Sequence, residues 1–287
     1  MITAVRRRPF LAFVLLAYLG SWIAWSPWWL SLSGIGVLAY QLPQTAVLGI
    51  NQLGLFAGPL PAALVITGIV DGRAGLRELW RRCLRWRIHP GWYGLAVIGI
   101  PVAAGAGYLV TGSVAPDLDA ASQAAPLMIT YVSYLLGGPI QEEPGWRGVA
   151  QPLLQQRRSP LPVALIIGVI HCCWHAPLFL TREWDTARSG PSQLAAYLVL
   201  VIGLSVVLSW LGNGSGGSLL IVIIGHNGLN WALAAVAALT GRPVTDTWPA
   251  ALGIAALAVV AVIITRGRLG LPVAETDRGG PAAAGIR

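Results

Sequence analysis

The chain alternates long apolar segments with short polar connections. An α-helix needs about 20 residues to cross a bilayer, and eight apolar segments of the chain are close to this length. They are Phe10–Leu30, Ala46–Val70, Trp92–Val114, Ala125–Ile140, Leu161–Leu180, Gln193–Leu211, Ser218–Leu239 and Trp248–Thr265. The pattern predicts an all-α membrane bundle of about eight transmembrane helices, forming a single domain over residues 1–270, with a disordered tail at 271–287.

The composition supports this interpretation and excludes several others. Of the 287 residues, 55% are hydrophobic and only 10% are charged, whereas soluble globular proteins have about 45–50% apolar and about 25% charged residues. A soluble enzyme, a disordered protein and a coiled coil are therefore excluded. The chain is expected to be an integral membrane protein.

The charges predict an orientation. All 19 basic residues are arginines, and with 11 acids the net charge is +8. If the amino terminus lies inside, the inner side receives 16 of these 19 arginines, at positions 6–8, 73–87, 147–158 and 266–287. This bias predicts that both termini are cytoplasmic, and it explains the basic charge without nucleic-acid binding.

The largest polar stretch, residues 71–91, predicts an amphipathic helix at the membrane surface. Its apolar residues alternate with arginines at helical spacing, and they are Leu76, Leu79, Trp80, Cys83, Leu84 and Trp86. Such a helix would lie on the inner leaflet with its guanidinium groups toward anionic head groups.

Three polar motifs interrupt the apolar segments, where each charged group costs about 2.5–3.5 kcal/mol on an insertion scale. The motifs are Glu-Glu-Pro-Gly-Trp-Arg at 142–147, His-Cys-Cys-Trp-His at 171–175 and His-Asn-Gly-Leu-Asn at 226–230. Because burial of such groups is costly, we interpret all three as functional.

Within the first motif, Glu143 and Arg147 are four residues apart, so on a helix they share a face and can pair. Glu142 lies about 100° around the helix and keeps no local partner, which leaves it available as a base. The alternative is a solvated helix end.

The other two motifs place His171 with His175, and His226 with Asn230, each four residues apart on separate segments. A single buried histidine would more often be a hydrogen-bonded core residue. Together with Glu142, however, these residues are expected to converge on one polar cavity. That set suits hydrolysis. Glu142 would take a proton from water held by His175, while His226 and Asn230 would stabilise the developing oxyanion.

The three motifs also resemble a known family. Glu-Glu-Pro-Gly-Trp-Arg-Gly, Trp-His-Ala-Pro-Leu-Phe and His-Asn-Gly-Leu-Asn-Trp, with Gly58-Pro59 upstream, are similar to those of the CAAX proteases and bacteriocin-processing enzymes. The resemblance covers about residues 58–231. It implies an intramembrane glutamic endopeptidase (a hydrolase, CAAX prenyl protease 2-like) that needs no metal or other cofactor, with eight helices and a cavity open to the cytosol.

By this resemblance Glu142 is the catalytic base, His175 its partner on the water, and His226 and Asn230 the oxyanion site. Glu143 and Arg147 form the supporting pair. One residue departs from the family pattern, because His171 stands where the family usually has Phe or Trp. We expect His171 to keep the aromatic shape and to add a hydrogen bond. The departure also leaves open zinc ligation by three histidines and a carboxylate, namely His171, His175, His226 and Glu142.

The expected partners are the lipid bilayer and a peptide or membrane-anchored protein, either prenylated or of the bacteriocin-precursor type. The all-arginine composition is typical of a GC-rich bacterial genome, so we expect a bacterial plasma membrane. Two alternatives to a protease stay open. One is a non-catalytic immunity or scaffold protein on the same fold, and the other is a transporter, which the lack of an evident inverted repeat disfavours.

Overall fold

The computed structural model describes residues 2–111, 120–182, 184, 190–240 and 244–271. Every regular element in these ranges is a helix, so the predicted all-α class is confirmed. Residues 272–287, nearly all of the predicted tail, lie outside the described residues, as do residues 112–114 of the third predicted segment.

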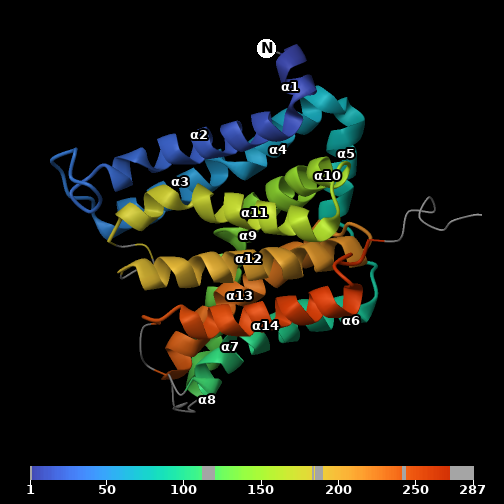
Figure 1. The fold of residues 1–287 in the computed structure, drawn as a ribbon. Helices are drawn as coiled ribbons and strands as arrows, with labels where there is room; N and C mark the ends of the chain where they lie inside the picture. Colours follow the sequence, from blue (N-terminus) through green and yellow to red (C-terminus); the bar gives the residue numbers. More distant parts are fainter. Residues whose placement is uncertain (1, 112–119, 183, 185–189, 241–243, 272–287) are drawn as a thin grey trace, which may run out of the picture.

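The helices run in the order in which the apolar segments predict them (Figure 1). The first half of the chain forms α1 (Ile2–Arg7), α2 (Pro9–Trp29), α3 (Gln44–Ala57), α4 (Pro59–Val70), α5 (Gly72–Cys83), α6 (Pro90–Gly94), η1 (Leu95–Gly99), α7 (Ile100–Val110) and α8 (Ala120–Leu136). The second half forms α9 (Pro139–Gly145), η2 (Trp146–Ala150), α10 (Gln151–Gln155), α11 (Pro160–Trp174), η3 (Ala176–Leu180), α12 (Gly190–Gly214), α13 (Leu219–Thr240) and α14 (Trp248–Thr265).

Six helical stretches in the described part of the chain are long and apolar enough to cross a membrane. They are Pro9–Trp29, Gln44–Val70, Pro90–Val110, Gly190–Gly214, Leu219–Thr240 and Trp248–Thr265. The protein is thus an integral membrane protein by length and composition, while the count of eight spans stays a prediction.

The other two predicted spans end earlier than the sequence pattern suggested. The fourth segment does not continue to Ile140 as one helix, because Gly138 has an extended backbone and Pro139 starts a new helix. The fifth segment is α-helical only to Trp174, because Pro177 follows closely and the chain tightens into the 3₁₀ turn η3.

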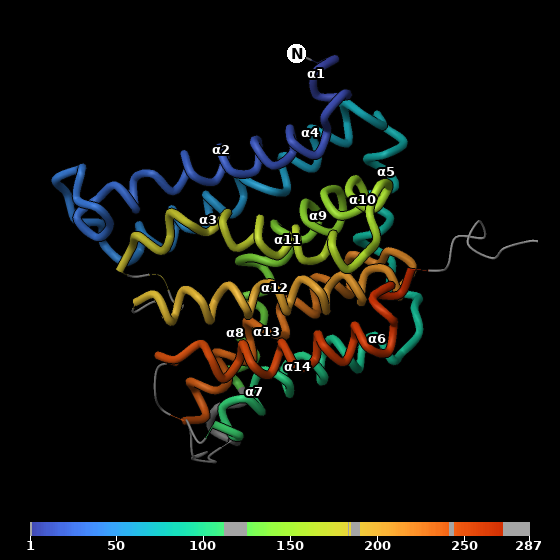
Figure 2. The backbone as a smooth tube through the Cα atoms, viewed as in Figure 1, coloured from blue at the N-terminus to red at the C-terminus, as the bar shows by residue number. Residues whose placement is uncertain are grey.

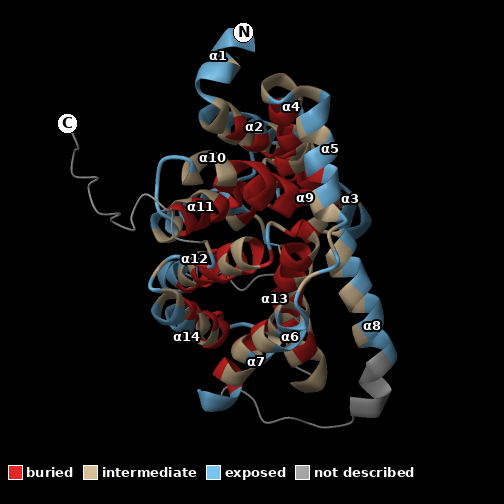
Figure 3. Cartoon of the chain, turned by 90° about the vertical axis from the view of Figure 1, so that its right-hand side faces the viewer, coloured by how far each residue is buried: buried red, intermediate tan, exposed pale blue. Residues whose placement is uncertain are grey.

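The bundle has a buried centre formed by α9, α12 and α13, whereas α1, α5 and α8 have exposed faces (Figure 3). Helix α12 packs between α11 and α14, and α14 packs against α7, as the tube view also shows (Figure 2). On the other side α2 packs against α3 and α4, and α4 packs against α9. Helix α9 therefore lies between the two halves of the bundle.

One close approach fixes α9 against α4. A Cβ added at Gly145 would lie 2.6 Å from the Pro59 Cβ and 2.8 Å from the Pro59 carbonyl oxygen. Only a glycine permits this contact. It joins the Pro-Gly of the first motif to the Gly58-Pro59 pair, so two sequence signatures far apart in the chain form one crossing point.

The arginine-rich segments gather at one end of the bundle. Helices α1, α5 and α10 and the carboxyl end of α14 all lie at the same end in Figure 1. The predicted sidedness of the arginines requires these segments to lie at one end of the bundle. In a bilayer, this end would lie at one face of the membrane.

The predicted amphipathic helix is present as α5, but one of its arginines has a different role from the one expected. Trp80, Leu84 and Trp86 are exposed and Leu79 is buried, as suits a helix at an apolar surface. Arg82 does not face head groups. Its guanidinium turns into the protein, because backbone carbonyl groups there lack other donors, as described below.

Candidate active site

The site begins at the start of α9, where a proline and a preceding glycine set the position of two glutamates. Pro139 occupies the first turn, where a missing N–H costs nothing. A Cβ at Gly138 would lie 3.3 Å from a Glu142 carboxylate oxygen and 3.9 Å from the side-chain nitrogen of Asn230. Because Gly138 has no side chain, the Glu142 carboxylate and the Asn230 amide both have room on the same side of its backbone.

Glu143 is the anchor of a fully buried ion-pair network. Arg147 donates from one nitrogen to both of its carboxylate oxygens, at 2.9 and 3.0 Å. His226 places Nδ1 2.6 Å from one of the same oxygens. The predicted pairing of Glu143 with Arg147 is observed, and a third member, His226, joins it from α13.

Because a carboxylate only accepts hydrogen bonds, His226 must donate from Nδ1. Its Nε2 then faces away from Glu143 and is the nitrogen left for a substrate. The negative charge of Glu143 stabilises the doubly protonated ring, in which Nε2 is also a donor.

Glu142 has a separate partner. His171 places Nε2 2.7 Å from a Glu142 carboxylate oxygen, and both side chains are buried. The imidazole lies in a stack between the Trp146 ring, whose centroid is 5.1 Å away, and the His175 ring at 5.3 Å. His171 therefore occupies an aromatic position and adds a hydrogen bond there, as expected for its departure from the family pattern.

His175 ends α11 and is oriented through its Nδ1. That nitrogen lies 3.3 Å from the backbone oxygen of His171 and 3.2 Å from the hydroxyl of Tyr197 on α12. Since a carbonyl can only accept, Nδ1 carries the proton, and Nε2 is left as the basic nitrogen. The predicted role of His175, which is to hold a water, needs this tautomer.

Taken together, the structure brings all seven predicted site residues from α9, η2, α11 and α13 into one region. Six of them are buried, namely Glu142, Glu143, Arg147, His171, His175 and His226. Asn230 is partly exposed and approaches the site next to Gly138.

The four-residue zinc set is wrong in one member. The ligand atoms of Glu142, His171 and His175 all lie within 4.8 Å of one another. His226 is not part of this group, and its Nδ1 contacts Glu143 instead. Three of the four groups that the sequence offered as ligands are therefore gathered.

Two residues that the sequence analysis overlooked also shape the site. Tyr197 orients His175, and nothing in the local sequence of α12 distinguishes this tyrosine from an ordinary apolar packing residue. Arg82 acts on the helix that carries Arg147. Its three guanidinium nitrogens donate to the carbonyl oxygens of Gly217, Gly148 and Arg147 at 2.9, 2.9 and 3.1 Å.

The π-helical turn η2 explains why these carbonyls accept from Arg82. The N–H of Gln151 bonds to the Trp146 oxygen, one residue further back than in an α-helix, so the Arg147 oxygen loses its usual donor. Pro152 has no N–H to offer the Gly148 oxygen. Arg82 supplies both missing donors. Burial of this guanidinium lowers the pKa of Arg82 from its ordinary value.

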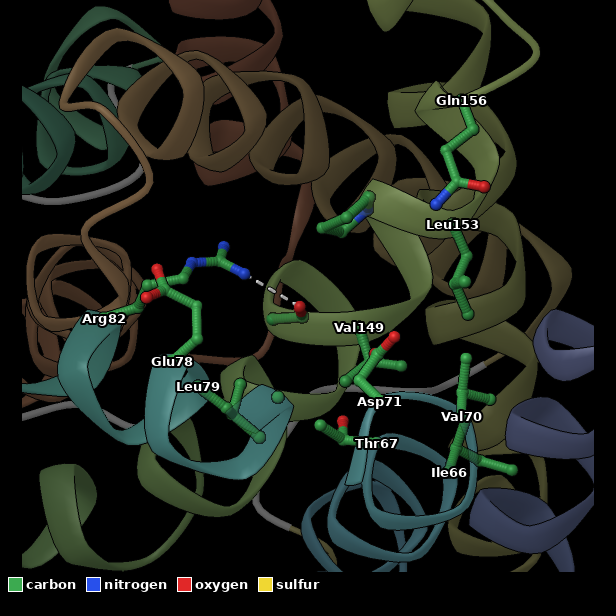
Figure 4. A pocket seen from close by; sticks show the side chains of 13 residues that line it. Ile66, Thr67, Val70, Asp71, Glu78, Leu79, Arg82, Val149, Leu153 and Gln156 are labelled. Carbon is green, nitrogen blue, oxygen red and sulfur yellow. Dashed lines mark hydrogen bonds between the residues drawn. The ribbon is translucent and has the colours of Figure 1, made fainter. Parts of the chain in front are cut away.

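A cavity of about 280 Å³ lies beside Arg82, between α4 and α5 on one side and η2 and α10 on the other. It is lined by apolar groups such as Ile66 and Leu153 and by the polar side chains of Asp71, Glu78 and Gln156 (Figure 4). None of the seven predicted site residues lines this cavity. It is thus distinct from the cluster around Glu142, although both use the η2 segment.

A family model described as Type II CAAX prenyl endopeptidase Rce1-like matches residues 124–232. The matched segment contains all three motifs and every one of the seven site residues. The comparison with curated proteins gives no match. The family match supports the assignment of the chain to the CAAX proteases and bacteriocin-processing enzymes, as the resemblance of the motifs predicts, and thereby to membrane endopeptidases in general.

Proposed function

We propose that this CAAX-type membrane protease is a glutamic endopeptidase in which Glu142 activates the attacking water without a metal. The observation that carries the proposal is the division of labour between the two neighbouring carboxylates. Glu143 is neutralised by Arg147 and His226, whereas the partner of Glu142 in the described part of the chain is the imidazole of His171. One carboxylate is thus structural, and the other is free to accept a proton.

In the reaction, a water lies between Glu142 and Nε2 of His175. Glu142 takes one proton from this water as the oxygen attacks the scissile carbonyl carbon. The protonated Glu142 then gives that proton to the departing amine when the tetrahedral intermediate collapses. The remaining lone pair on Nε2 of His175 fixes the water by accepting its second hydrogen.

The developing oxyanion is stabilised by Nε2–H of His226 and by the side-chain amide of Asn230. Both residues project from α13 four positions apart, which places them on one face of that helix. Donors already fixed by the fold stabilise the transition state without reorganising when the reaction occurs. Glu143 and Arg147 maintain the orientation of His226.

The substrate is a peptide or a membrane-anchored protein, prenylated or of the bacteriocin-precursor type, cleaved near the cytoplasmic face of a bacterial plasma membrane. Two features support that side. The arginine-rich segments gather at one end of the bundle, and the amphipathic helix α5 at that end exposes Trp80, Leu84 and Trp86. Both chain termini are then cytoplasmic.

The test uses the full chain, purified and reconstituted in liposomes, with an internally quenched peptide library that includes prenylated members. Glu142→Gln removes the base but keeps the shape, so cleavage should fall by at least about 1,000-fold. Glu78→Gln, which neutralises an exposed acid on α5, is the matched control and should retain activity. Cleavage by Glu142→Gln at the wild-type rate would rule out the proposal.

A cellular readout separates the protease from a non-catalytic immunity or scaffold protein on the same fold. If the chain is a protease, Glu142→Gln should abolish its cellular phenotype while the variant still accumulates in the membrane. A phenotype that survives this substitution would favour the scaffold.

A further inference from the structure

Glu142, His171 and His175 form a group with more ligating capacity than water activation requires. In the mechanism above one carboxylate and one imidazole hold the water, and His171 is an extra nitrogen donor at the same place. The ligand atoms of all three residues lie within 4.8 Å of one another, and the three side chains are buried.

We propose that these three residues form a reversible Zn²⁺ site, and that zinc binding there switches the peptidase off. The binding stands on the geometry alone, whereas the inhibitory effect rests on the proposed function. Two histidines and one glutamate are a common set of three protein ligands for zinc, and they leave a fourth position open to water.

The distances are compatible with a small closure around an ion. Tetrahedral coordination with zinc bonds of about 2.0–2.1 Å places ligand atoms about 3.3 Å apart. The contact between Nε2 of His171 and Glu142 is 2.7 Å, so an ion entering between them would displace the Nε2 proton to solvent and widen this pair. His175 would move in from its separation of at most 4.8 Å.

The orientation of His175 favours the same use. Metal-binding histidines usually donate their second ring N–H to a carbonyl or a carboxylate, and this contact fixes the tautomer and the ring plane. Nδ1 of His175 makes such a contact with the His171 backbone oxygen and also contacts Tyr197. The other nitrogen, Nε2, is therefore already in the form that binds a metal.

The surrounding charges also permit a dication. The Glu143–Arg147 pair is electrically balanced, so the nearby net charge is that of the protonated His226, whose ring centroid lies 5.9 Å from that of His171. Glu142 brings one negative charge to the ion, and a hydroxide or another anion at the open position can bring a second.

Zinc bound in this way would inhibit rather than activate. The lone pairs of Glu142 that must accept the proton of water would coordinate the ion instead. The position of the attacking water between Glu142 and His175 would be filled by the same ion. Glu142 is the base of the proposed mechanism, so its coordination to the ion would stop the reaction.

The binding test uses the metal alone. The full chain in detergent is stripped with chelator, and Zn²⁺ is added in a calorimeter, with Co²⁺ absorption as an independent report of tetrahedral nitrogen and oxygen ligands. We expect one Zn²⁺ per chain. His171→Phe, which keeps an aromatic ring in the stack, should weaken binding at least about 100-fold, and His171→Gln serves as a second variant.

Two control variants distinguish this site from adventitious binding. His89→Ala removes the exposed histidine at the start of α6, and Cys173→Ser removes an exposed thiol. Both should bind zinc as the wild type does. Loss of the one-site titration in either control, its persistence in His171→Phe, or no stoichiometric binding at all would overturn the proposal.

The regulatory effect is measured separately, with the cleavage assay. Zn²⁺ at saturating concentration should lower the wild-type rate at least about 10-fold, and chelator should restore it. Stoichiometric binding that leaves cleavage unchanged or accelerates it overturns the inhibitory role. If no peptide is cleaved under any condition, the proposed function fails, while the binding result still decides whether the zinc site exists.

Discussion

His226 Nδ1 lies 2.6 Å from a carboxylate oxygen of Glu143 that also accepts a hydrogen bond from Arg147. Through this contact Glu143 links the first and third motifs, because its carboxylate on α9 fixes the imidazole ring of His226 on α13. Without the carboxylate, His226 would lose both its orientation and the charge that favours the doubly protonated ring.

Glu143→Gln should therefore impair catalysis through His226 while leaving Glu142 in place. An amide can still contact Nδ1 but does not stabilise an imidazolium, and it leaves Arg147 buried without its counter-charge. We expect kcat to fall about 100-fold with a smaller change in KM, together with a lower melting temperature. A kcat equal to that of the wild type would show that His226 needs no carboxylate.

Asn230→Ala should show the signature of a lost transition-state donor. Removal of one oxyanion donor typically costs about 100- to 1,000-fold in kcat. Because Asn230 lies at the partly exposed edge of the site, the fold should be little affected, and KM should stay within a few fold. Steady-state cleavage kinetics and thermal unfolding of the same preparation provide both readouts. A large change in KM with kcat intact would instead indicate ground-state binding.

Arg82→Ala should destabilise the protein and disturb the site at a distance. It removes donors to the Arg147, Gly148 and Gly217 carbonyls, two of which have no helical partner. Charge-assisted hydrogen bonds contribute about 1.5–3 kcal/mol each, and they do not add fully, so a loss of about 2–4 kcal/mol is expected. Arg77→Ala changes an exposed arginine of the same helix and is the control.

Arg82→Lys should recover only part of that loss, since one ammonium cannot reach three carbonyls as the planar guanidinium does. Chemical unfolding in detergent measures the free energies of unfolding, which should decrease from the wild type to Arg82→Lys to Arg82→Ala. A lysine variant equal to the wild type would mean that only the charge of Arg82 matters.

Gly145→Ala should separate α9 from α4. The new Cβ would meet two atoms of Pro59 at 2.6 and 2.8 Å, and overpacking of this kind typically costs about 1–3 kcal/mol. Gly49→Ala, in α3, meets nothing within 4 Å and should be neutral or slightly stabilising. Equal melting temperatures for the two variants would contradict the close approach that the structure shows.

The sequence predicted well those contacts that helical spacing determines. Glu143 and Arg147 lie four residues apart on one continuous helix, so their pairing follows from geometry alone. The convergence of the three motifs followed from the high cost of leaving histidine, asparagine or glutamate in lipid. These arguments need no knowledge of which helix packs against which.

Contacts between helices could not be predicted in the same way. The sequence gives no indication whether Glu142 or Glu143 meets a histidine, nor which histidine it would be. The answer depends on the rotation of α9 and α13 about their axes. The structure pairs Glu142 with His171 and Glu143 with His226.

Arg82 was misinterpreted because it belongs to a run of arginines whose composition suits a membrane surface. The π-helical turn that draws it inward has no signature of its own beyond Pro152. The expected spans likewise extended too far, to Ile140 and Leu180. Gly138, Pro139 and Pro177 end the regular α-helices before the apolar pattern of the sequence ends.

The π-helical turn also determines how this segment can change in length. In an uninterrupted α-helix Glu143, Arg147 and Gln151 would follow one another along a single face. With the wider turn, Arg147 pairs with Glu143, while Gln151 faces α12 and bonds to Ser209 and Asn213. A single-residue deletion between 147 and 151 would close the wider turn to an ordinary α-helical one and leave the helix after it nearly in place, whereas the same deletion in an α-helical segment rotates everything after it by about 100°. This turn is therefore the place in the segment where homologous chains should differ in length by one residue.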